Sequence, residues 1–143
     1  LIAELDARMA AYGAAMEASE IRRAATELRA IWAAGNEYLQ KAAPWATFKT
    51  EPDRAAAQIR IGGNLIRLYA ILSRPFVPDA SDKMLAALSL SADVANDWPR
   101  SGREALAALG PGAPVTPPEN LFAKIEDDAR AGWEAAFSGA AAS

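Results

Sequence analysis

The run Asn36-Glu37-Tyr38-Leu39, followed after four residues by Pro44-Trp45, decides how this chain folds. Proline has no N–H to donate, and it disfavours helical backbone in the residue before it. The helix that contains Leu39 is therefore predicted to end near Ala43, with Trp45 in the connector just beyond. In one interpretation, the Trp45 side chain folds back and covers the core. In the other, it stays partly exposed and contacts a partner.

Alanine, leucine and charged residues dominate from Leu1 to Ala43, a composition that predicts helix. Two helices fit this stretch, the first ending at about Met16 and the second capped by Ser19. Apolar or small residues recur along the second helix at spacings of three and four: Ile21, Ala25, Leu28, Trp32, Gly35, Leu39 and Ala42. This stripe predicts a packed helix face, with Trp32 in the core and a close helix approach at Gly35.

A third helix is predicted from about Glu51 to Ser73, because Thr50 and Asp53 form a start similar to a capping box and Pro52 is tolerated in a first turn. Arg74-Pro75 then ends it. Further helices are expected at three places: from a cap at Asp79 or Ser81 through Leu88, from Ser101 to Leu109, and from Glu126 to Phe137.

The segment from Gly110 to Pro118 is too rich in proline and glycine for a helix and is predicted to cross the bundle as an extended loop. The fold class predicted from these patterns is all-α. We divide the chain into a helical bundle over residues 1–110 and a loop with a C-terminal helix over residues 111–143. The second part is expected to pack back on the bundle or toward another domain.

The composition excludes several kinds of site. With 143 residues, of which 52% are apolar, the chain suits a single globular domain, and no apolar run approaches the roughly eighteen residues that span a membrane. Histidine and cysteine are absent, so disulfides, thiolate metal sites and the usual general base are missing. The acidic run Glu126-Asp127-Asp128 is interpreted as a solvated first turn of a helix, and we expect neither a catalytic nor a metal site.

The first residue is Leu, and we interpret the chain as an internal fragment of a longer protein.

The net charge of −3 hides an uneven distribution. Residues 1–40 carry four basic and six acidic groups, residues 41–74 carry six and two, and residues 75–143 carry five and ten, giving −2, +4 and −5. The middle segment, which begins beside Pro44-Trp45, is the basic one. It is the part suited to contact with phosphates.

Four sequence blocks, in order along about two thirds of the chain, carry a resemblance to a known family. They are Gly35-Asn36-Glu37-Tyr38-Leu39 with Ala43-Pro44-Trp45 and Lys49, Ile61-Gly62-Gly63-Asn64-Leu65-Ile66-Arg67, Leu72-Ser73-Arg74-Pro75-Phe76-Val77-Pro78, and Pro118-Glu119-Asn120-Leu121-Phe122-Ala123-Lys124-Ile125-Glu126. In these blocks the chain resembles the methionyl-tRNA synthetases. The part of those enzymes that it resembles is their C-terminal helical anticodon-binding domain. The resemblance implies the helical bundle of a class I aminoacyl-tRNA synthetase.

The resemblance implies a longer parent enzyme that attaches methionine to tRNA(Met) and uses Mg-bound ATP. This enzyme is expected to be cytoplasmic and to have no membrane partner. The adenylation signatures of the family, His-Ile-Gly-His and Lys-Met-Ser-Lys-Ser, belong to a separate domain and do not occur here. This segment is therefore expected to bind no cofactor itself. Its partners are expected to be tRNA(Met) and its own catalytic domain.

The resemblance implies that Trp45 stacks on an anticodon base. It also implies that Pro44 fixes the direction of the Trp45 side chain. Asn36 is a candidate for anticodon contact, although nine helical residues separate it from Trp45 by about 13 Å. Its other interpretation, which also applies to Asn64, is structural: the amide ties the helix to a neighbouring backbone. Lys49, Arg54 and Lys41 are candidates for phosphate contact, whereas Arg60 and Arg67 are expected to pair with carboxylates.

Two other functions remain compatible with the sequence. One is the equivalent domain of another class I synthetase, such as those for leucine, isoleucine, valine or cysteine. The other is a helical protein-interaction module that binds no RNA, which the acidic charge and the high alanine content suit. Full burial of Trp45 would favour this second function.

Overall fold

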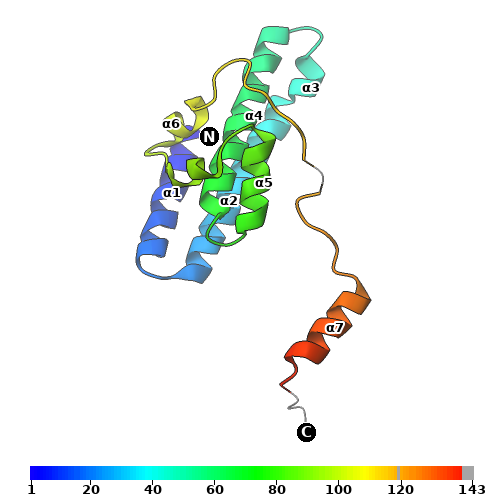
Figure 1. The fold of residues 1–143 in the computed structure, drawn as a ribbon. Coiled ribbons are helices and arrows are strands. Elements are labelled where there is room, and N and C mark those ends of the chain that lie inside the picture. Colours follow the sequence, from blue (N-terminus) through cyan, green and yellow to red (C-terminus); the bar gives the residue numbers. More distant parts are fainter. Residues whose placement is uncertain (119, 140–143) are drawn as a thin grey trace.

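The structure is a computed structural model that describes residues 1–118 and 120–139 (Figure 1). All regular structure in these ranges is helical, which confirms the all-α prediction. The first two helices, α1 (Ile2–Glu17) and α2 (Ile21–Ala42), form an antiparallel hairpin. The predicted cap at Ser19 is wrong, because Ser19 has left-handed backbone in the turn and Glu20 precedes the helix without a side-chain cap.

A long central helix, α4 (Pro52–Ser73), packs against the hairpin and supplies much of the core. The main core cluster takes its largest buried side chains from α1, α2 and α4: Leu5, Tyr12, Leu28, Ile31, Leu65, Leu68, Ile71 and Leu72. The Tyr12 hydroxyl donates to the Leu72 carbonyl oxygen at 2.8 Å. This bond joins the first helix to the end of the central one.

The packed face of α2 is close to the predicted stripe but rotated from it. Ile21 is 54% exposed, whereas Ala24 and Ile31, which lie outside the stripe, are buried. The predicted close approach at Gly35 is confirmed, since a Cβ there would lie 1.8 Å from the Tyr69 hydroxyl oxygen on α4.

Two further helix starts differ from the prediction. Thr50 does not cap α4: its hydroxyl donates to the Thr47 carbonyl, and Glu51 is the residue before the helix. Neither Asp79 nor Ser81 caps α5 (Pro78–Ala87), because Pro78 already occupies its first position. In each case proline at the first helical position, where the missing N–H costs nothing, begins the helix.

Two short helices complete the bundle. A 3₁₀ helix, η1 (Ala92–Asn96), was not predicted, and α6 (Gly102–Ala107) begins where expected, with the Ser101 side chain accepting from the Glu104 N–H. The segment from Gly110 to Pro118 is extended, as predicted. Its Thr116 N–H donates to the Ala87 carbonyl at the end of α5 at 2.7 Å.

The last helix, α7 (Asp127–Phe137), lies apart from the bundle (Figure 1). Glu126 precedes it and Asp127 and Asp128 occupy its first turn, all exposed, as the interpretation of this acidic run required. None of its residues is buried, so it does not pack back on the bundle in this structure. In the described residues no helix is both long and apolar enough to cross a membrane.

Candidate nucleic-acid interface

The turn that carries Trp45 is built by Ala43 and Pro44. Proline disfavours right-handed helical backbone in the residue before it, and Ala43 takes a left-handed conformation with φ 45°. The structure corrects one detail, because Pro44 does not open an irregular connector. It begins a further short helix, α3 (Pro44–Thr47), and its own side chain is buried. The direction of the chain after α2 is thereby fixed.

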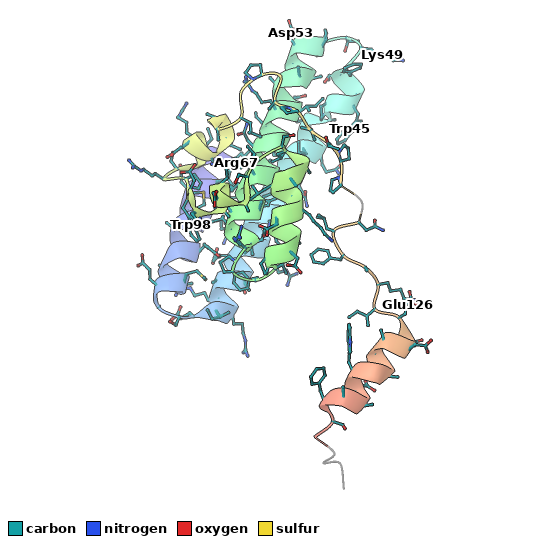
Figure 2. All side chains as sticks on the ribbon, in the orientation of Figure 1. Trp45, Lys49, Asp53, Arg67, Trp98 and Glu126 are labelled. Carbon is teal, nitrogen blue, oxygen red and sulfur yellow. The ribbon has the colours of Figure 1, made fainter. Side chains whose placement is uncertain are left out.

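Trp45 is exposed. Its side chain retains 64% of its accessible surface, and Figure 2 shows it on the side of the bundle opposite Trp98. Neither ring contact between aromatic side chains found in the described residues involves Trp45. Trp32, by contrast, packs against the core and meets Tyr69 edge to face at 6.5 Å, as predicted. The interpretation of Trp45 as a cover for the core is therefore wrong.

Phe48 was not singled out in the sequence, yet 61% of its surface is exposed. It follows α3 directly and retains right-handed helical backbone, so it lies three helical residues after Trp45. Side chains at that spacing are neighbours on a helix surface. The spacing Trp-x-x-Phe in this short turn was the signal from which its exposure beside Trp45 was predictable.

Most of the basic groups between residues 41 and 74 are paired with carboxylates. Lys41 pairs with Glu37, Arg54 with Glu51, Arg67 with Asp97 and Arg74 with Asp82. The expected pairing is confirmed for Arg67, whose buried guanidinium lies 2.7 Å from the Asp97 carboxylate. It is wrong for Arg60, which has no carboxylate partner in the described part of the chain.

Lys49 is the candidate phosphate contact that remains free. It is exposed and forms no hydrogen bond or ion pair within the residues that the structure describes. Lys41 and Arg54 are also exposed, but each has a carboxylate three or four residues away to neutralise it. Lys49 therefore offers a charge without a carboxylate partner in the described residues, on the segment that also carries Trp45 (Figure 2).

The Glu37–Lys41 ion pair also shifts the pKa values of both side chains. The hydrogen bond from Lys41, together with its charge, lowers the pKa of the Glu37 carboxyl, and the same bond raises the pKa of the Lys41 ammonium. Both groups are thus charged at neutral pH. A phosphate that binds Lys41 has to compete with Glu37.

The two asparagines differ in role. Asn64 is fully buried, donates from Nδ2 to the carbonyls of Arg60 and Leu109, and accepts at Oδ1 from the Leu109 N–H at 2.7 Å. Its structural interpretation is confirmed. The same interpretation is wrong for Asn36, which is exposed and makes no side-chain hydrogen bond among the described residues.

A cleft of about 550 Å³ lies between α4 and the loop after α6, with Ile59, Arg60 and Val115 among its lining residues. It includes neither Trp45 nor Phe48. The two exposed aromatics therefore lie outside this cleft. Across residues 1–118 and 120–139, no group of three acidic side chains is arranged to hold a metal ion.

An exposed tryptophan on a turn fixed by proline, with a lysine four residues later that is unpaired in the described residues, suits the binding of unpaired bases. The model of the family described as the anticodon binding domain of methionyl tRNA ligase matches residues 1–142. The chain belongs to this family. The methionyl-tRNA ligase family accounts for all four sequence blocks, and the equivalent domain of another class I synthetase is thereby excluded.

Individual relatives agree with this assignment to the methionyl-tRNA ligase anticodon-binding domains. Over 139 residues, or 97% of this chain, it is 60% identical to the methionine–tRNA ligase of Ruegeria pomeroyi and 55% identical to that of Paracoccus denitrificans. The match covers 24% of each of these relatives, so the chain spans about a quarter of their length. No solved structure matches it.

Proposed function

We propose that this domain binds the anticodon loop of methionine tRNA, with Trp45 stacking on an unpaired base and Pro44 fixing the direction of the ring. The observation that carries the proposal is the 64% exposure of Trp45 on a fixed turn. An anticodon loop offers bases that can be splayed out and stacked on aromatic side chains. Stacking of one base contributes about 1–3 kcal/mol.

A π-face does not by itself distinguish one base from another, so polar groups have to read the base edge. Asn36 is exposed with its amide unengaged by the rest of the described structure, and we assign it to an anticodon base edge. Lys49 is assigned to a backbone phosphate. Arg54 and Lys41 are assigned to weaker phosphate contacts, because their carboxylate partners compete.

The rest of the parent protein is proposed to supply the chemistry. Its relatives are named methionine–tRNA ligases and are about four times as long as the matched segment. We infer that the parent attaches methionine to tRNA(Met) in the cytoplasm with Mg-bound ATP, outside the present segment. Residues 111–143 are proposed to dock on the catalytic domain, since Trp133 and Phe137 on α7 are exposed at 54% and 84%.

The test is tRNA binding by the full-length parent enzyme with Trp45→Ala, using methionine tRNA and a tRNA with a changed anticodon. Loss of one stacked base is expected to weaken the cognate complex by about fivefold to 150-fold and to leave the non-cognate complex nearly unchanged. Ile21→Ala is the control, because Ile21 is an apolar residue with a similar exposure of 54% that lies at the start of α2, at the other end of that helix from Trp45.

Circular dichroism checks that the helices persist in both variants. Equal binding of the cognate tRNA by the wild type and by Trp45→Ala would exclude the stacking role. If the domain also failed to distinguish the two anticodons, a helical protein-interaction module would become the better function.

A further inference from the structure

Phe48 adds a second aromatic to the surface around Trp45. The two side chains are 61% and 64% exposed, and Phe48 has φ −53° and ψ −37°, so the helical turn of α3 continues through it. At a separation of three helical residues, Cβ atoms lie about 5–6 Å apart on the same side. Their Cβ atoms therefore lie on the same side of this turn.

Phe48 does not hold the junction between α3 and α4. That junction is closed by backbone bonds, from the N–H groups of Thr50 and Glu51 to the Thr47 carbonyl at 3.1 and 2.8 Å. A single exposed phenylalanine is ordinary on a protein surface. An exposed pair of aromatics followed at once by the free Lys49 is the combination that binds single-stranded nucleic acids.

We propose that Phe48 is a second stacking residue, which binds the base next to the one bound by Trp45. This inference rests on the proposed function of the domain. A base sandwiched between two rings requires them to be about 7 Å apart, twice the roughly 3.4 Å rise per nucleotide. Neither aromatic ring contact found in the described residues joins Trp45 to Phe48, and we assign one base to each ring.

Lys49 completes the arrangement. Neighbouring bases are joined through one backbone phosphate, and a phosphate contact positions a strand without reading its sequence. Lys49 directly follows Phe48 and carries no carboxylate partner in the described residues. Its ammonium is suited to neutralise a phosphate of the nucleotides that the two rings hold.

The experiment uses the full-length enzyme and methionine tRNA transcripts with 2-aminopurine at one purine position of the anticodon loop at a time. Stacking on an aromatic ring quenches 2-aminopurine emission. The variants are Phe48→Leu, which keeps apolar bulk without a π-face, Phe48→Tyr, which keeps the ring, and Trp45→Leu. Ile21→Ala is the control, since Ile21 is an exposed apolar residue at the opposite end of α2.

Phe48→Leu is expected to weaken tRNA binding at least about fivefold and to restore emission at a position different from the one affected by Trp45→Leu. Phe48→Tyr and Ile21→Ala are expected to behave as the wild type. ATP–pyrophosphate exchange, a reaction that needs no tRNA, is expected to be unchanged in every variant and shows that the catalytic domain is intact. Circular dichroism of each variant checks that the helices of the anticodon-binding domain persist.

An unchanged affinity in Phe48→Leu, a Tyr variant as weak as the Leu variant, or emission restored at the Trp45 position would each overturn the role of Phe48. If Trp45→Leu still weakens binding in those cases, the proposed function stands without the second stack. If neither Leu variant changes cognate binding, both proposals are wrong.

Discussion

Single polar atoms join segments that lie far apart in the sequence. The Tyr12 hydroxyl bonds to the Leu72 carbonyl, and the Asn64 amide closes on both backbone groups of Leu109. Each of these groups is buried, so loss of a partner leaves an unsatisfied atom at a cost of about 1–3 kcal/mol. The burial has a second consequence for Tyr12, since it raises the pKa of the phenol to about 12.

The raised pKa predicts a loss of stability at high pH. Tyrosine titrates near 10 when unfolded, so between pH 10 and 12 the unfolded chain binds fewer protons than the folded one, and the free energy of unfolding falls as pH rises. The contribution of Tyr12 is of the order of 1–3 kcal/mol.

Denaturant titrations at pH 9, 10 and 11 are expected to show that the free energy of unfolding declines less steeply with pH for Tyr12→Phe than for the wild type. Burial also raises the pKa of Tyr69 to about 12, so part of the decline persists in the variant. Parallel curves would contradict the prediction.

The contact between α2 and α4 depends on the absence of a side chain at Gly35. The Tyr69 hydroxyl donates to the Trp32 carbonyl at 3.3 Å and passes directly over Gly35. A glycine inside a helix costs about 1 kcal/mol relative to alanine. The packed Tyr69 ring offsets that cost at this point.

Gly35→Ala is therefore expected to destabilise the domain by about 1–3 kcal/mol, because its Cβ would meet the Tyr69 hydroxyl oxygen at 1.8 Å and Leu65 Cδ1 at 3.1 Å. Gly63→Ala on α4 is the matched control. Its Cβ would find its nearest neighbour, Leu109 Cδ1, at 3.6 Å, and the gain in helix propensity is expected to stabilise the domain by up to about 1 kcal/mol. Urea denaturation measures both, and a stabilising Gly35→Ala would show that Tyr69 does not constrain this helix pair.

The whole molecule presents less positive charge than its basic segment suggests. Of the six basic groups between residues 41 and 74, four form ion pairs, and within the described residues Lys49 and Arg60 are the two without a carboxylate partner. In a protein with a net charge of −3, the positive field that reaches a nucleic acid is therefore local. One of its two sources, Lys49, lies on the turn that carries the exposed aromatics, and the other, Arg60, lies on α4.

This distribution predicts different salt dependences for two lysines. In the full-length enzyme, Lys49→Met is expected to reduce the slope of log affinity against log salt by about 0.7–1, the loss of one phosphate contact. Lys41→Met is expected to change it less, because Glu37 already neutralises that ammonium. Glu37→Gln frees Lys41 and is expected to steepen the slope. Equal effects of the two lysine variants would show that the ion pair does not persist in the complex.

The helices and the break at Pro44 were predictable from local chemistry, since proline, small-residue spacing and turn composition act within a few residues. The caps of three helices were misplaced, because the sequence offered polar residues next to the true cap positions, which are Glu20, Glu51 and Val77. Family membership was equally available, since the four blocks are properties of the chain alone. The roles of Trp45, Pro44, Asn36, Lys49, Arg54 and Lys41 toward tRNA remain proposals.

The sequence by itself determined that the chain is helical, that it turns at Pro44, and which family it belongs to. Only the tertiary structure decided which side chains are available to a partner. Trp45 and Phe48 are exposed, and of the two asparagines Asn64 is buried whereas Asn36 is exposed. Of the basic groups, Arg67 is paired with Asp97, whereas Lys49 has no ion-pair partner in the described residues. The physical reason is that local preferences depend on neighbours along the chain. Burial and charge pairing depend on residues such as Asp97 and Leu109, which the fold brings from thirty or more positions away.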